Sequence, residues 1–289
     1  MLKVERNIAY NVKNIFEKRE FTNNGYTLKY CIYVPKNYDC GETYPLMLFL
    51  HGAGERGSDN ELQLAVAIQS MFNDPTSPVY DSIVIAPQCP EDTQWVLTPW
   101  YNVNYSIAET PESIQLETVC MVLDECMDNY NVDPDRVYVT GISMGGYGTW
   151  DMLSRHGARF AAGLPICGGG DTAYAKLLKR IPIRTFHGSE DGAVPVLGTR
   201  RMFAAIKNAG GELIDYTELD GWDHGIWDYV YSDRRNIDWL FAQSRKDRRL
   251  KAEKNAKYKK LAAIGGAAGA ALSIVLALTA NKKKKAKKK

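Results

Sequence analysis

The chain has 289 residues, 45% of them hydrophobic and 24% charged, which is typical of a globular protein with a substantial core. Its net charge of +2 hides an uneven distribution, because residues 245–289 contain 16 Lys and Arg but only 2 Asp and Glu. Taken from the totals of 36 and 34, these leave 20 basic and 32 acidic residues in 1–244, a net charge of −12. Such an acidic body argues against a nucleic-acid-binding protein, since phosphate groups are bound by clustered Lys and Arg.

The cysteines and the N-terminus point to a reducing compartment. The six cysteines include no C-x-x-C pair, so the sequence carries no zinc or redox signature. Cys31 and Cys167 lie in apolar stretches and are expected to be buried thiols, while a Cys31–Cys40 disulfide stays open as an alternative. The first twenty residues lack the apolar run of a secretory signal. We therefore expect the body of the protein to be cytoplasmic.

Apolar runs of strand length alternate with helical patterns along residues 1–245. This alternation predicts βαβ crossovers and an α/β fold with a mostly parallel sheet flanked by helices. The strand patterns cover residues 26–34, 45–50, 82–86, 136–140, 162–166, 181–186 and 212–218. The helical patterns cover residues 111–130, 144–156, 197–209 and 233–241. We expect no large cap domain, because residues 86–136 hold only a loop and one helical pattern.

The composition changes after residue 245. Residues 246–260 form a basic, helix-prone linker, residues 261–280 contain no charge, and residues 281–289 are rich in lysine. Twenty helical residues span about 30 Å, so 261–280 predicts a C-terminal transmembrane helix that anchors the protein to a membrane. Gly265 and Gly269 form a G-x-x-x-G pair that would suit a homodimer. A helix packed against protein is the alternative.

The stretch VYVTGISMGGYG, residues 137–148, combines a β-branched run, a tight turn and a helix start. Gly141 and Gly145 flank Ser143 at i−2 and i+2, which is the spacing of a nucleophile elbow. A serine hydroxyl is a weak nucleophile unless a base removes its proton and a further group orients that base. Ser143 is therefore a candidate catalytic nucleophile, although a strand-to-helix turn that merely contains serine has the same pattern.

The base and the acid are sought after Ser143, because an elbow of this kind precedes its acid and then its histidine. His224 lies in a Gly-containing loop after the last strand pattern, whereas His156 lies on the helix that follows the elbow and cannot easily fold back. Asp191, with Glu190 as second choice, lies in the loop HGSEDGAVP. A surface histidine and a solvated acidic turn are the alternatives.

Two backbone N–H groups are needed to stabilise the oxyanion that forms on acyl transfer. The residue after the nucleophile, Met144, is expected to supply one of them. Ala53, or failing that Gly54, would supply the second from the glycine-rich loop that follows PLMLFL. In the same loop, His51 is expected to anchor the backbone. Glu55 and Arg56 are expected to form a local ion pair.

Substrate specificity is the least readable property of the sequence. Polar and aromatic side chains in segments expected near the rim of the site are candidate substrate contacts, and ordinary packing explains each of them equally well. They are Gln88, Trp95, Trp100, Tyr101, Trp222 and Trp227.

Six motifs in a fixed order carry a resemblance to a known family. They are LFLHGAGERG, IVIAPQCP with the following Trp95, DRVYVTGISMGGYGTW, PICGGGD, HGSEDGAVP and DHGIWD. Residues 25–240 thereby resemble the α/β-hydrolase superfamily, and more narrowly bacterial esterases of the polyhydroxybutyrate-depolymerase and feruloyl-esterase type, which are often grouped with prolyl-oligopeptidase-like serine hydrolases. The resemblance implies the α/β-hydrolase fold and Ser143, Asp191 and His224 as catalytic triad.

The expected reaction is hydrolysis of a small-molecule carboxylic ester through an acyl-enzyme, with no metal or cofactor. The same groups would serve a peptidase or a lysophospholipase, and the predicted anchor makes a lipid substrate attractive. An inactive, membrane-tethered scaffold is a further alternative from another functional class, and the intact set of candidate catalytic groups argues against it.

Overall fold

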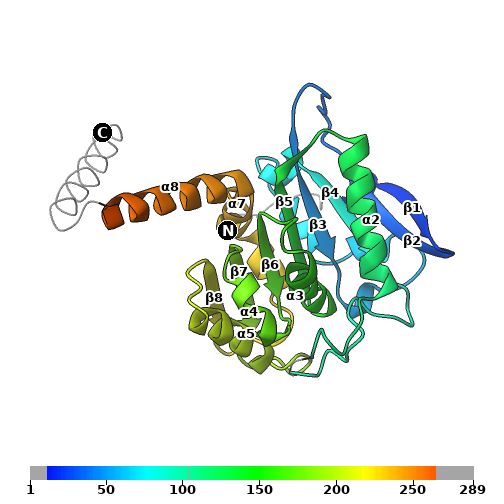
Figure 1. Cartoon of the computed structure of the whole chain (residues 1–289). Helices are drawn as coiled ribbons and strands as arrows, with labels where there is room; N and C mark the ends of the chain where they lie inside the picture. Colours follow the sequence, from blue (N-terminus) through cyan, green and yellow to red (C-terminus); the bar gives the residue numbers. More distant parts are fainter. Residues whose placement is uncertain (1–11, 104, 265–289) are drawn as a thin grey trace, which may run out of the picture. The chain divides into compact units, whose positions relative to one another are not determined.

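A computed structural model describes residues 12–103 and 105–264. An eight-stranded sheet in the order β1-β2-β4-β3-β5-β6-β7-β8 forms its centre (Figure 1). The strands are β1 Glu17–Asn23, β2 Tyr26–Tyr33, β3 Tyr44–Leu50, β4 Ile83–Gln88, β5 Val132–Ile142, β6 Ala162–Ile166, β7 Ile183–Gly188 and β8 Ile214–Leu219. Only the pairs β1–β2 and β2–β4 are antiparallel, so the predicted mostly parallel sheet is confirmed.

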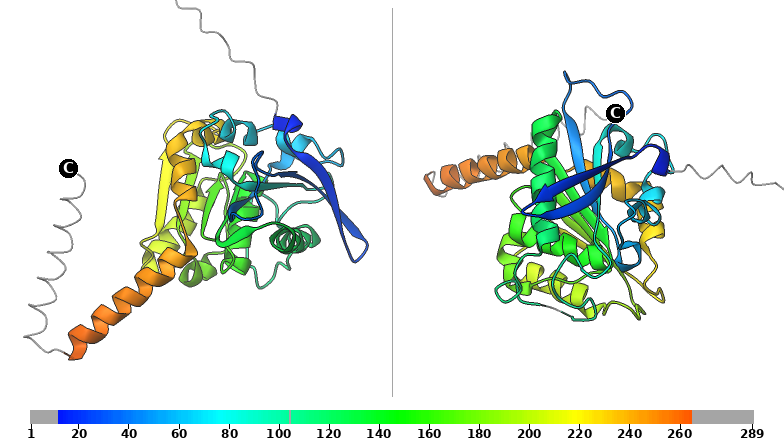
Figure 2. Two further views of the ribbon diagram at one scale, coloured as in Figure 1. Left: turned by 90° about the horizontal axis from the view of Figure 1, so that it is seen from above. Right: turned by 90° about the vertical axis from the view of Figure 1, so that its right-hand side faces the viewer.

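Helices cover both faces of the sheet, as Figures 1 and 2 show. One face packs against α2 Ile114–Asn129, α3 Met144–His156, α4 Ala175–Leu178 and α5 Leu197–Asn208. The other packs against α1 Ile68–Met71, α6 Trp227–Ser232 and α7 Arg234–Phe241. Between β4 and β5 the structure describes a loop and α2, in agreement with the predicted absence of a large cap domain.

The central strands are apolar on both faces because each face is covered. Along β3, Leu46, Leu48 and Leu50 enter the core beneath α3, while Met47 and Phe49 enter the core on the opposite face. This two-sided burial explains why PLMLFL reads as a continuous apolar run rather than as an alternating one.

Within the described residues, the structure adds the strand β1 and the short helices α1, α4 and α6 to the elements predicted from the sequence. The strand β1, EKREFTN, escaped detection because it is a largely polar edge strand. Because most of its side chains are exposed, the strand lacks the alternation of apolar and polar residues that would have predicted it. The helix α6 closely follows His224 and precedes the predicted last helix. All six cysteines are free: Cys31 is buried and Cys40 exposed, so the alternative disulfide is not formed.

Contacts divide the chain into two units, residues 1–244 and 245–289. In the second unit the helix α8 spans Arg245–Ile264 and includes the stretch predicted as a basic linker. Within residues 12–103 and 105–264, no helix has both the length and the apolar character needed to cross a bilayer. The transmembrane helix predicted for 261–280 and the Gly265–Gly269 pair lie outside the described residues, apart from the first four positions of that helix.

Candidate active site

Ser143 occupies the turn between β5 and α3 in a strained conformation. Its φ of 55° and ψ of −119° are unusual for a residue with a side chain, and such strain costs on the order of 1–3 kcal/mol. Neighbouring chain approaches the turn so closely that a Cβ on Gly145 would lie 1.9 Å from the Leu50 carbonyl oxygen. The glycine spacing predicted from the sequence is therefore a steric requirement of this turn.

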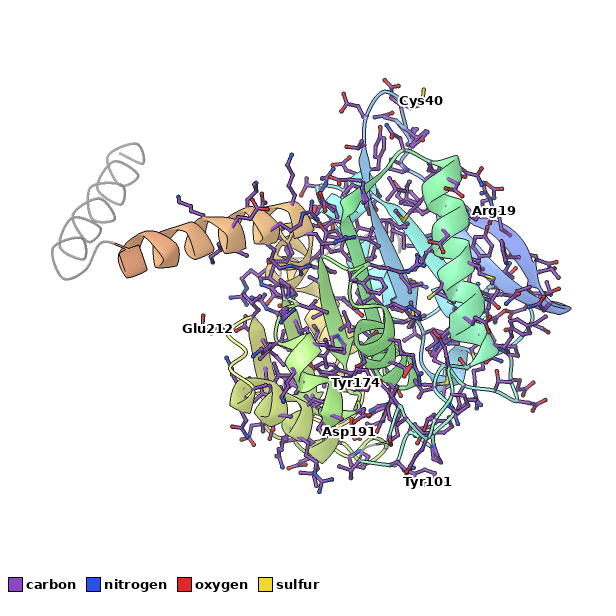
Figure 3. All side chains as sticks on the ribbon, viewed as in Figure 1. Arg19, Cys40, Tyr101, Tyr174, Asp191 and Glu212 are labelled. Carbon is purple, nitrogen blue, oxygen red and sulfur yellow. The ribbon has the colours of Figure 1, made fainter. Side chains whose placement is uncertain are left out.

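His224 and Asp191 reach Ser143 from two loops at the carboxyl ends of β8 and β7. The His224 Nε2 lies 2.8 Å from the Ser143 Oγ, and the His224 Nδ1 lies 2.7 Å from the Asp191 Oδ2. In Figure 3, Asp191 lies at the end of the sheet opposite Cys40. The two loops pack tightly against each other, since a Cβ on Gly188 would lie 2.3 Å from the carbonyl oxygens of Trp222 and Asp223. The structure thus brings together the three side chains that the sequence singled out.

The Asp191 carboxylate is built to remain ionised. Its side chain has no exposed surface, and its Oδ1 accepts hydrogen bonds from the Ala193 and Val194 N–H groups at 2.9 and 2.8 Å. Burial by itself would raise the pKa of Asp191, but hydrogen bonds from His187, His224 and Val194 outweigh it and hold the pKa well below its usual range. A permanently charged acceptor fixes the orientation of His224.

The loop after β3 brings the candidate oxyanion donors beside Ser143. A Cβ on Gly52 would lie 3.5 Å from the Ser143 Cβ, which places this loop against the nucleophile. Ala53 begins a short 3₁₀ turn, Ala53–Glu55, and Met144 begins α3. In the described part of the chain, neither the Ala53 nor the Met144 N–H donates a hydrogen bond to protein. Both N–H groups therefore remain available to an oxyanion, and the exposed Gly54 stays a further candidate.

His51 anchors this loop, as predicted. Its Nε2 accepts a hydrogen bond from the Cys89 N–H at 2.9 Å, and its Nδ1 donates to the Gly52 carbonyl at 2.6 Å. Complete burial lowers the pKa of His51 to about 4, so the ring is neutral near pH 7. The Trp95 Nε1–H donates to the His51 carbonyl at 3.0 Å and closes the anchor.

Similar proteins agree with this architecture. A family model described as "Putative esterase" matches residues 23–165, about half of the chain. A solved thermostable esterase is 36% identical with a TM-score of 0.71, over 80% of this chain and 64% of its own. The bifunctional acetylxylan esterase/xylanase of Neocallimastix patriciarum is 32% identical over 90 residues, which are 31% of this chain and 13% of that enzyme. A ferulic acid esterase shares the fold at 16% identity and a TM-score of 0.60, over 78% and 97% of the two chains.

The chain belongs to the α/β-hydrolase superfamily. In this fold the active site lies at the carboxyl ends of the strands, with the nucleophile on a strained turn between a strand and a helix. Ser143 and the loops that follow the strands have these positions in the present structure.

Two of the candidate substrate contacts in this α/β hydrolase require correction. Trp95 has no exposed surface, because it packs beneath the site against the His51 ring at 5.1 Å. Gln88 is 2% exposed, and its amide bonds the Asp59 carboxylate and the Asn60 N–H at 2.8 and 2.7 Å. Both side chains support the loops around the site instead of lining its rim.

The remaining aromatic candidates have surface near the site. The Trp227 ring meets the His224 ring edge-on at 5.2 Å, and Trp222 is 42% exposed and packs on Tyr229. Trp100 is half-buried in a segment held by Tyr147, whose Oη lies 2.6 Å from the Asn102 carbonyl oxygen. Their contact with a substrate remains a prediction.

Arg56 ties the oxyanion loop to the Trp100 segment. Its guanidinium donates to the carbonyls of Ala53 and Thr93 at 2.9 and 3.2 Å and lies 5.5 Å from the centre of the Trp100 ring. The predicted ion pair with Glu55 is wrong, since among the described residues the Arg56 guanidinium meets two carbonyls and the Trp100 ring and no cation affects Glu55. Burial raises the pKa of the Glu55 carboxyl, while the N–H groups of Gly52 and Glu55 oppose that shift.

Two clusters in the described residues have side chains of the kinds that bind metals. One consists of Cys167 with Asp191 and His224, whose carboxylate and ring already serve Ser143. The other consists of Glu112, Cys120 and His156, where a Glu112–His156 ion pair of 2.7 Å occupies two of the three groups.

Sequence reasoning missed two neighbours of Asp191. His187 Nε2 lies 3.0 Å from the Asp191 Oδ2, and the Cys167 Sγ lies against the same carboxylate. Burial raises the pKa of the Cys167 thiol well above its usual value, so the sulfur stays neutral. The motif HGSEDGAVP contains His187, but its spacing to Asp191 indicates no contact until the loop is folded.

A separate groove of about 1000 Å³ beside β8 and α7 is not lined by Ser143, Asp191 or His224.

Proposed function

We propose that this α/β hydrolase is a serine carboxylesterase that cleaves a small-molecule ester through an acyl-enzyme. The observation that carries the proposal is the unbroken hydrogen-bond chain from Ser143 through His224 to Asp191. Because the His224 Nδ1 faces an ionised carboxylate, its proton resides on Nδ1 and the lone pair of Nε2 points at the serine hydroxyl.

In the proposed reaction, His224 takes the Ser143 proton while Oγ attacks the ester carbonyl carbon. The resulting oxyanion is held by the N–H groups of Met144 and Ala53, at the N-terminus of α3 where the helix dipole also favours negative charge. His224 then protonates the leaving alcohol, and water repeats the sequence to release the acid and regenerate the serine.

The comparisons support an ester substrate more than the alternatives. The solved protein at 36% identity is described as an esterase, and the enzyme matched at 32% over 90 residues is described as a bifunctional acetylxylan esterase/xylanase. Similarity to an acylaminoacyl peptidase of Pyrococcus horikoshii, at 17% identity and a TM-score of 0.54 over 78% of this chain and 40% of that one, shows the fold alone. Acetyl and feruloyl esters are the first substrates to test, with a lysophospholipid and a peptide anilide as competing outcomes.

The experiment compares the wild-type chain with Ser143→Ala on p-nitrophenyl acetate, p-nitrophenyl butyrate, methyl ferulate, acetylated xylan, a lysophospholipid and a proline-containing peptide anilide. Wild-type ester turnover that vanishes in the variant, together with fluorophosphonate labelling at Ser143, supports the proposal. Preferential cleavage of the anilide or the lysophospholipid would replace it by one of the alternatives. A folded wild-type protein without turnover or labelling would indicate an inactive scaffold.

We further propose a cytoplasmic hydrolase attached to a membrane by residues 261–280. The support is the sequence, which has no charged residue over these twenty positions. Fractionation of cells that express the full chain or residues 1–244 tests this: a shift from membrane to soluble fraction on truncation supports it, and an identical distribution contradicts it. Digestion of the hydrolase from outside intact cells would contradict the cytoplasmic side.

Association of the full chain through Gly265 and Gly269 is the third proposal. The G-x-x-x-G spacing lets two helices approach closely in a bilayer. Cross-linking in detergent tests it, with Gly269→Leu as the disrupting variant. Ala268→Leu, one position earlier and outside the glycine pair, is the matched control. Equal dimer yields from the wild type and both variants would contradict the proposal.

A further inference from the structure

His187 is a second histidine on the candidate catalytic acid. It lies near the end of β7 and has no exposed surface. Its Nε2 lies 3.0 Å from the Asp191 Oδ2, the same oxygen that lies 2.7 Å from the His224 Nδ1. Two imidazole rings therefore share one carboxylate oxygen, and only the His224 ring is open to the site, with 19% of its side chain exposed.

The atoms that face the His187 Nε2 are both acceptors. Nε2 is within 3.0 Å of the Asp191 carboxylate and 3.1 Å of the Val194 carbonyl, and neither has a proton to donate. On the other side of the ring, Nδ1 lies 2.8 Å from the Thr199 hydroxyl, which itself lies 2.6 Å from the Gly168 carbonyl oxygen.

The Thr199 hydroxyl has a single proton to place. If it pointed at His187, two acceptor oxygens would stand 2.6 Å apart with no hydrogen between them. If it points at Gly168, the Thr199 oxygen accepts and the His187 Nδ1 must donate. The second arrangement satisfies every group, and it requires a proton on both ring nitrogens of His187.

We propose that His187 is a buried imidazolium that acts as a positioning residue: it balances the charge of Asp191 and thereby lowers the pH at which His224 becomes free to act as a base. This rests on the proposed function of the Ser143 site. If His187 were neutral, the full negative charge of Asp191 would stabilise the protonated form of His224. With His187 charged, the same oxygen already has a cation, so it stabilises a second one less.

The size of the effect follows from the distance between the rings. Two hydrogen bonds to one oxygen place the ring nitrogens less than about 6 Å apart. One unit charge at that separation, in a partly buried site, corresponds to a shift of about one to two pH units.

Among the ionisable groups around His187, Glu218, Arg200 and Cys167 keep a constant charge near neutral pH. Arg200 on α5 holds Glu218 of β8 in an ion pair and lowers its pKa to about 2, and Cys167 stays a neutral thiol. The groups that face this region from neighbouring elements are Asp191, Cys167, Glu218, Arg200, Asp223 and His224. A change in the charge of His187 is therefore expected to affect mainly the protonation of His224.

The first test is NMR of the full chain labelled with ¹⁵N-histidine, which contains four histidines. The signals that disappear in His187→Gln are expected to show two protonated ring nitrogens from pH 6 to pH 9. His156 is also a cation at pH 8, since its pKa is raised to about 10, so His156→Gln assigns its signals separately. A His187 ring with one unprotonated nitrogen at pH 7 overturns the proposal.

The second test is the pH profile of kcat/KM for ester cleavage. His187→Gln is expected to move the midpoint of the acidic limb upward by about one unit or more. Thr199→Val, which removes the acceptor of the Nδ1 proton, should move it in the same direction by less. Thr185→Val is the matched control, because it deletes a buried 2.8 Å bond to the Pro165 carbonyl outside the His187 contacts and should leave the midpoint in place.

The outcomes separate this proposal from the proposed function. An acidic limb that stays in place or moves downward in folded His187→Gln overturns the role of His187. If Thr185→Val shifts the limb as much as Thr199→Val does, the effect is a general loss of packing and the role of His187 is likewise overturned. Absence of ester turnover from the wild type overturns the proposed function, and the NMR result then stands by itself.

Discussion

Among the described residues, two histidine–carboxylate pairs have a partly exposed histidine, and only one of these two histidines faces a candidate nucleophile. His224 lies 2.7 Å from Asp191 at the carboxyl end of the sheet, and His156 lies 2.7 Å from Glu112 at the end of α3. Their side chains are similarly accessible, with 19% of His224 and 26% of His156 exposed. Distance and exposure therefore do not distinguish the candidate base from a structural ion pair.

The difference lies in what else each ring meets. The free nitrogen of His224 points at the hydroxyl of Ser143 on a strained turn. His156 is instead held by Cys120 and then by Glu112, which together raise its pKa to about 10, so near pH 7 it is a cation with no lone pair to offer. A histidine–carboxylate pair becomes a catalytic element only where the second nitrogen faces a group that has a proton to lose.

Removing the carboxylate from each pair gives the largest expected contrast. Asp191→Asn should lower kcat for ester cleavage by about 10³–10⁴-fold, since an amide neither fixes the tautomer of His224 nor stabilises its cation. Glu112→Gln should leave kcat within about twofold, because Glu112 does not contact the Ser143 site. Steady-state kinetics at pH 8 measures both, and equal losses in the two variants would contradict the contrast drawn between the pairs.

The turn at Ser143 and the loop that carries His224 should differ in how well they tolerate a side chain in place of glycine. Gly145→Ala should lower the free energy of unfolding by about 3 kcal/mol or more, because its Cβ would lie 1.9 Å from the Leu50 carbonyl oxygen. Gly225→Ala, in the loop that carries His224, meets no atom within 4 Å and is the matched control. Urea unfolding compares them, and a Gly145→Ala protein as stable as Gly225→Ala would show that the turn tolerates a side chain.

The structural pair should appear in the pH dependence of stability. The folded-state pKa of His156 is raised to about 10 from an ordinary value of 6.5, so its contribution is complete below about pH 6.5 and is lost as the pH rises to about 10. Partial exposure reduces the contribution of Glu112 to about 1 kcal/mol. Between pH 6 and pH 10, the melting temperature should fall less steeply for Glu112→Gln than for the wild type. Parallel curves would mean that Glu112 contributes nothing to this dependence.

Glu55 provides the smallest effect, and its substitution should stabilise the protein, since no cation opposes the effect of burial on this carboxylate in the described part of the chain. Burial raises its pKa in the folded state, so stability falls as the pH rises above the ordinary value of about 4.5. Glu55→Gln removes that cost and should raise the melting temperature at pH 8 by about 1 °C, with the difference vanishing near pH 4. A lower melting temperature at pH 8 would show that Glu55 is stabilised by its local N–H groups.

Sequence reasoning succeeded where the determinant was local or followed from the order of strands. The β-branched run and the glycine spacing around Ser143 specify strand, turn and helix within twelve residues. The order of Ser143, Asp191 and His224 was sufficient to place three distant side chains together, because the loops that follow parallel strands lie at one end of a sheet. The helix α3 was predicted with its observed bounds for the same local reason.

Tertiary structure decided everything that depends on contact between loops. Trp95 and Gln88 resemble rim residues in the sequence, but the loop after β3 folds over them and buries both. His187 gave no sign of its role, since its protonation depends on acceptors from Asp191, Val194 and Thr199 that meet only in the folded chain. Residue types and their order determine which groups reach the end of the sheet. The packing of the loops determines the hydrogen-bond partners of each group, and through them its charge.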